Sequence, residues 1–105
     1  MTSPTTAEVL EAAADRIAKP GAWTKGTFQR GGNCYCAMGA IAAAAGCSHM
    51  AALAHPATIA LADYLGGRSS PNSVVADFND APGRTQAEVV EALRAAALQA
   101  AGGAE

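Results

Sequence analysis

Cys36 is the residue whose position most directly suggests chemistry. A cysteine in the first turn of a helix has its thiolate favoured by free N–H groups and the helix dipole. A thiol hydrolase would need His49 or His55 as the base, with Asn79 or Asp80 orienting the imidazole. In the structural interpretation, Cys36 is a small buried apolar residue and Asn79-Asp80 caps a turn. We expect little room for a substrate cleft in so short a chain, so the hydrolase remains the alternative.

A second group of residues has the chemistry of a zinc site. Three thiols and one imidazole form a ligand set that zinc accepts, and they are Cys34, Cys36, Cys47 and His49. The spacing argues against it, because paired ligands in structural zinc sites are more often separated by two or more residues. If residues 36–46 form a straight helix, Cys36 and Cys47 lie about 16 Å apart. The helix and the zinc site exclude each other, and we predict the helix. We expect no cofactor.

The polar segment 79–85 precedes the most strongly predicted helix. In a recognition loop, Arg84 would bind a carboxylate or phosphate, helped by the positive N-terminus of that helix. In the structural interpretation, which we favour, Asp80 and Thr85 accept hydrogen bonds from backbone N–H groups. Arg84 would then pair with Asp80 or Asp77.

Trp23 and a run of cations are further candidates for binding. Trp23 is either the largest piece of the core or, if exposed, an interaction hot spot. Residues 16–62 carry four basic side chains and no acidic one, and we expect these to pair with the acidic C-terminal half rather than to bind an acidic partner. The candidate binding residues are therefore Trp23, Arg30, Asn79, Asp80 and Arg84.

Helix-start and helix-stop signals predict the elements that position these residues. Capping-box spacings occur at Thr5/Glu8 and Thr85/Glu88, and glycines follow several apolar stripes. The predicted helices span residues 5–19, 34 or 36–45 (with Asn33 a plausible N-cap), 55–65, 70–78 and 85–101, with a short capped turn at 48–54. Residues 22–33, rich in glycine, suit a loop or a short irregular hairpin. Residues 74–75 also allow a brief strand. We predict an all-α fold of about five helices, with the second helix at its centre.

Two segments resemble a known family. They are residues 32–41 (GNCYCAMGAI) and 78–89 (FNDAPGRTQAEV), together with an Ala-rich helix leading to Trp23. They resemble a family of short proteins from actinobacteria and their phages whose function is unknown. Phe78 stands where the family pattern has Trp. The resemblance spans roughly residues 7–98; it implies an actinobacterial or actinophage origin and no particular activity.

Composition limits the class of protein. The chain has 105 residues, including 28 Ala and 11 Gly, and a net charge of −2. We expect one small domain over residues 1–105, with residues 1–4 and 102–105 frayed. The low net charge and the absence of a basic tail argue against nucleic-acid binding.

Residues 31–62 contain no Asp, Glu, Lys or Arg. This length could cross a membrane, but the run is mostly alanine and is interrupted by glycine and proline, so we expect no membrane span. The N-terminus lacks the features of a secretory signal, and three cysteines do not form a disulfide framework. We therefore expect a cytoplasmic protein with reduced thiols.

The leading hypothesis is a small non-catalytic protein that binds another protein. A short Ala-rich domain buries little apolar area, and a face shared between two copies would add to it. A homodimer is therefore one form that the interaction could take. The Cys36 hydrolase and the zinc module are the alternatives.

Overall fold

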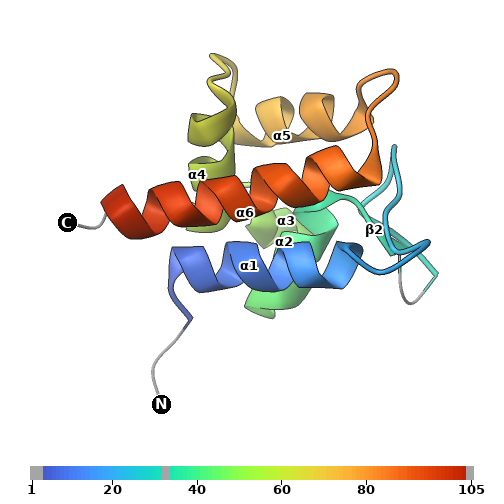
Figure 1. The fold of residues 1–105 in the computed structure, drawn as a ribbon, viewed down its shortest axis with the longest axis horizontal. Helices are drawn as coiled ribbons and strands as arrows, with labels where there is room; N and C mark the ends of the chain where they lie inside the picture. Colours follow the sequence, from blue (N-terminus) through green and yellow to red (C-terminus); the bar gives the residue numbers. More distant parts are fainter. Residues whose placement is uncertain (1–3, 32–33, 104–105) are drawn as a thin grey trace.

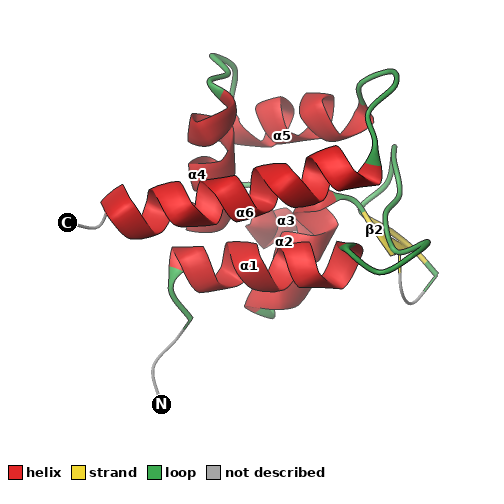
Figure 2. Ribbon diagram, in the orientation of Figure 1, coloured by secondary structure: helices red, strands yellow, loops and turns green. Residues whose placement is uncertain are grey.

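The computed structural model describes residues 4–31 and 34–103. Within this part of the chain, six α-helices accompany one two-stranded antiparallel ladder (Figures 1 and 2). The elements are α1 (Thr6–Ile17), β1 (Gln29–Arg30), β2 (Cys34–Tyr35), α2 (Ala37–Ala45), α3 (His49–Ala52), α4 (Pro56–Leu65), α5 (Pro71–Asp80) and α6 (Gln86–Gly103). The all-α prediction and the short hairpin after the first helix are confirmed. The helix beyond the expected five is α3, where a capped turn was predicted.

Both predicted capping boxes are present. The Glu8 N–H donates to Thr5 Oγ1 at 3.1 Å, and the Thr5 N–H donates to Glu8 Oε1 at 2.7 Å. At the start of α6, the Thr85 and Glu88 pair makes the same two bonds at 2.9 and 3.2 Å. These interactions join residues three apart, so the local sequence is sufficient to set where α1 and α6 begin.

The ends of the middle helices follow similar local rules. Gly46 and Gly66 end α2 and α4 in the left-handed conformation, with φ of 71° and 76°. His55 caps α4 and Cys36 caps α2; the expected cap Asn33 lies outside the described residues.

The fifth helix differs from the prediction at its C-terminal end. α5 is helical at Val74-Val75, so the strand alternative is wrong, and it continues to Asp80, two residues beyond its predicted end. Asn79 and Asp80 therefore lie on a helix rather than in a loop. At the chain ends expected to fray, residues 1–3 and 104–105 are outside the described part, whereas Gly102 and Gly103 belong to α6.

α1 and α6 lie antiparallel, side by side, at the front of the molecule in Figure 1. α2 lies behind them and packs against α1, and α5 contacts both α2 and α4. The interior is filled by few large side chains: Leu10, Ile17, Ile41, Leu61, Val75, Val89 and Leu93 are fully buried. Alanines fill much of the remainder. As predicted, α2 is central, since every residue from Ala37 to Ala42 is buried.

The uncharged run at residues 31–62 is divided among α2, α3 and α4. These helices are separated by turns, and none of the described helices is both long and apolar enough to cross a membrane.

Candidate functional site

Asn79 is the polar centre of the region where α2, α5 and the Trp23 loop meet. Its Oδ1 accepts hydrogen bonds from Trp23 Nε1 at 2.7 Å and from the Ala37 N–H at 3.0 Å. Its Nδ2 donates to the Thr24 carbonyl at 3.1 Å and to Asp80 Oδ1 at 2.9 Å. Only 2% of the residue is exposed. Asn79 thus joins three segments far apart in sequence, which is a structural role rather than a surface contact.

Asp80 lies beside this centre but faces solvent. Its Oδ1 accepts a second hydrogen bond from the Gly26 N–H at 2.9 Å. Its other carboxylate oxygen, Oδ2, forms no hydrogen bond with residues 4–31 or 34–103. Asp80 therefore positions the Gly26 loop through Oδ1.

A pocket of about 160 Å³ lies next to Asp80. Its lining consists of Gly26, Thr27, Phe28, Cys36, Met38, Val75, Ala76, Asn79 and Asp80. The walls are mainly apolar, and the carboxylate of Asp80 is the charged group among them. An apolar cavity of about 150 Å³ admits a benzene-sized group, so this pocket can hold one apolar side chain. Although the chain is short, it therefore leaves room for a small cleft beside Cys36.

The Cys36 thiol is held in its neutral form. Burial raises the pKa of Cys36 above its ordinary value of 9.0, and the charge of Asp80 raises it further. Hydrogen bonds from backbone N–H groups, above all that of Gly39 at 3.3 Å, act in the opposite direction but do not outweigh burial. The predicted activation by a helix start is therefore overcome by desolvation.

Neither histidine completes a catalytic set with Cys36. The His49 ring is stacked on Phe28, with ring centroids 4.7 Å apart. His55 Nδ1 accepts the Ala57 N–H at 3.0 Å and so caps α4. No imidazole belongs to the described lining of the pocket. The fold therefore brings Cys36, Asn79 and Asp80 to one pocket but places the rings of His49 and His55 in other contacts.

The rate of alkylation reports how readily the Cys36 thiol loses its proton. In a variant with Cys34 and Cys47 changed to serine, we expect iodoacetamide to label Cys36 slowly, with a rate that rises only above pH 9.0. The thiolate is the reactive species, and its population grows only near the raised pKa. The pKa of Cys36 is higher in the folded state than its ordinary value of 9.0 in the unfolded chain. The neutral thiol therefore contributes fully to stability below pH 9.0, and this contribution is lost as pH rises through the folded-state pKa. Labelling that is fast and complete at pH 7 would contradict this assignment.

The four residues proposed as zinc ligands are not gathered at one point. Cys36 and Cys47 flank α2 at opposite ends, and the Cys34 thiol donates to the Gly21 carbonyl at 2.8 Å. In the described residues, no three His, Cys, Asp or Glu side chains are grouped as metal ligands. α2 forms as predicted, and its length separates the two halves of the ligand set.

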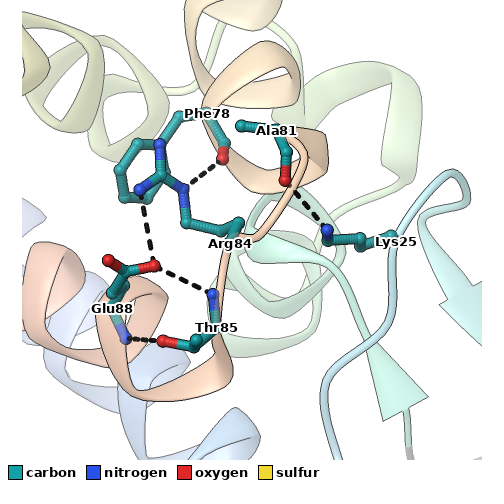
Figure 3. Close-up of polar contacts among 6 residues, drawn as sticks. All are labelled: Lys25, Phe78, Ala81, Arg84, Thr85 and Glu88. Atoms are coloured by element: carbon teal, nitrogen blue, oxygen red, sulfur yellow. Dashed lines mark hydrogen bonds and ion pairs between the residues drawn. The ribbon is translucent and has the colours of Figure 1, made fainter.

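Arg84 fastens the loop between α5 and α6, as Figure 3 shows. Its Nε donates to the Phe78 carbonyl at 2.7 Å, and its guanidinium lies over the Phe78 ring at 3.9 Å from the centroid. Its Nη1 lies 3.5 Å from Glu88 Oε1. The predicted pairing with Asp80 or Asp77 is therefore wrong. With these contacts made inside the chain, Arg84 acts mainly as a clamp on the turn.

The other predicted binding residues have different surroundings. Trp23 is half-buried, so it is neither the centre of the core nor a free hot spot, and its indole N–H is engaged by Asn79. Arg30 is exposed on β1. Lys25 donates to the Ala81 carbonyl at 2.9 Å and lies over the Trp23 ring (Figure 3 shows the Ala81 bond).

The expected pairing of the basic segment with the acidic C-terminal half is also wrong. Within the described residues, the ion pairs involve Arg84 and Arg94 instead, the latter bridging Glu11 and Asp15 on α1.

Sequence reasoning missed the pocket walls contributed by Phe28, Met38, Val75 and Ala76. Apolar periodicity assigns such residues to the core and carries no signal that distinguishes a filled space from an empty one.

A comparison with known families finds a match over most of the chain. The sequence model of the family described as "Family of unknown function (DUF6197)" matches residues 1–99. No curated protein and no solved structure matches the chain. The resemblance to a family of unknown function is confirmed, and the match brings no activity with it.

Proposed function

Because the chain belongs to this family of unknown function, we propose its role from its own geometry: it is a non-catalytic protein that binds a partner protein. The observation that carries this proposal is the apolar pocket between α5, the start of α2 and the Gly26–Phe28 loop. The pocket receives one apolar side chain of the partner. Asp80 Oδ2 accepts a hydrogen bond from an N–H or a cation next to that side chain.

The surroundings of the pocket favour binding over catalysis. Its shape is held by the Asn79 hydrogen bonds, so the walls are in place before a partner arrives. Such preorganisation lowers the entropic cost of association. The position of Cys36 in the wall favours the thiol hydrolase as a second candidate, but burial raises the pKa of Cys36 and so disfavours the thiolate that such an enzyme uses.

Cell compartment and origin are part of the same proposal. All three cysteines are free thiols, which fits a reducing cytoplasm. The abundance of alanine and glycine fits a high-GC genome, such as that of an actinobacterium or actinophage. The partner would then be a protein of that bacterial cytoplasm.

Filling the pocket tests the proposal. Ala76 is part of the pocket wall, so Ala76→Leu places three more carbons in the space meant for the partner. The parent chain and the variant are each used to retain proteins from actinobacterial lysate, and the retained proteins are quantified by mass spectrometry. We expect at least one protein to be about tenfold less abundant with Ala76→Leu than with the parent chain, which is equivalent to about 1.4 kcal/mol.

The matched control is Ala51→Leu, at an exposed position on α3 outside the pocket. It makes the same change in side chain, and we expect it to retain the same proteins as the parent chain. Equal retention by all three proteins would refute the pocket as the binding site.

A further inference from the structure

The outer surface of α1 and α6 is a second apolar feature, separate from the pocket. Two shallow grooves of about 490 and 420 Å³ follow the seam between these helices. Val90 lies in the first groove and Leu98 in the second. Leu98 is 73% exposed, and the other apolar residues that line its groove are all alanines. Small residues along the seam permit close approach of another helix.

Carboxylates border both grooves. Glu8, Glu11 and Asp15 border the groove at Leu98, and Glu91 borders the one at Val90. Arg94 is the single basic residue in the two linings. Its guanidinium is already bonded to Glu11 and Asp15, at 2.8 and 3.0 Å. With four carboxylates and one guanidinium, the seam carries a net charge of −3.

We propose that the α1–α6 seam docks an amphipathic helix of a partner protein, whose apolar stripe covers Leu98 and Val90 and whose lysines or arginines face the carboxylates. α1 has 12 residues and α6 has 18, so the seam along which they lie side by side is about 18 Å long, which matches a helix of at least about three turns. The apolar stripe supplies the burial, and the basic flanks supply orientation and the rate of encounter.

The negative charge of the seam favours a basic helix over a second copy of the chain, a nucleic acid or an anionic membrane. A second copy using the same face in a two-fold arrangement would bring two sets of carboxylates together. Nucleic acid and anionic membrane surfaces carry the same sign of charge as the seam and are repelled by it. This surface is distinct from the Ala76 pocket, so each can fail without the other.

The proposal is tested by measuring how tightly two synthetic helical peptides bind to the full chain. Both are 18 residues long with a leucine stripe, and they carry either lysine or glutamate at all flanking positions. By fluorescence anisotropy we expect the lysine peptide to bind at least about tenfold more tightly than the glutamate peptide. Its affinity is expected to fall as salt is raised from about 0.05 to about 0.5 M, because screening weakens exposed charge pairs.

Protein variants place the binding on the seam. Leu98→Ser is expected to weaken binding of the lysine peptide about tenfold. Glu91→Lys is expected to make the affinity for this peptide less dependent on salt. Met50 on α3 is 75% exposed and lies outside both grooves, so Met50→Ser is the matched control and should leave affinity unchanged.

Three results would overturn the proposal. The first is equal or undetectable binding of the two peptides. The second is an equal effect of Met50→Ser and Leu98→Ser, which would indicate nonspecific adhesion. The third is a dimeric mass by light scattering that Leu98→Ser reduces to a monomer, since the occupant of the seam would then be a second copy.

Discussion

Replacing Asn79 by alanine is expected to lower the free energy of unfolding by about 3–5 kcal/mol. The substitution removes four hydrogen bonds at once. It leaves the Ala37 N–H and the Thr24 carbonyl without their partner in a buried setting, and an unsatisfied buried polar group costs about 1–3 kcal/mol. The loss is large relative to a total stability of about 5–15 kcal/mol for a small domain. Urea unfolding followed by circular dichroism measures it.

Asn72 provides the control for this experiment. It lies in the first part of the same helix, α5, and is not buried. Asn72→Ala is expected to change stability by no more than about 0.5 kcal/mol. If Asn79→Ala also stays within about 1 kcal/mol of the parent chain, the hydrogen bonds described for Asn79 do not hold the three segments together.

Gly39→Ala is expected to destabilise the protein by about 2–3 kcal/mol, although alanine normally favours a helix over glycine by up to about 1 kcal/mol. A Cβ at Gly39 would overlap the carbonyl oxygen of Phe28 and lie 2.8 Å from its carbonyl carbon. That oxygen cannot easily move, because it accepts the Cys36 N–H at 3.1 Å. The added methyl must therefore displace either the Phe28 loop or α2.

Gly102→Ala separates this steric effect from helix propensity. Gly102 lies in α6, and a Cβ there would meet no atom within 4 Å. We expect that variant to be unchanged or stabilised by up to about 1 kcal/mol, opposite in sign to Gly39→Ala. Thermal unfolding of both proteins compares them, and a stabilised Gly39→Ala would show that the loop does not press on α2.

The helices and most of their ends could be predicted because their signals are local. A capping box joins residues three apart, and a glycine at a helix end meets a conformational demand within one turn. The same reasoning failed at Asn79 and Asp80. Their types suit a turn, but bonds to Trp23, Gly26 and Ala37, at least 42 residues away, are made from the last turn of α5.

By itself, the sequence determined an all-α chain with an Ala-rich interior and a central second helix. In that helix, Gly39 has no side chain, so it permits the close approach of another segment. Only the tertiary structure decided that the Phe28 loop fills that place, that a pocket forms beside Cys36 and that burial keeps its thiol neutral. Hydrogen bonding within a turn depends on neighbours along the chain, whereas desolvation and empty space depend on every segment that packs around a point.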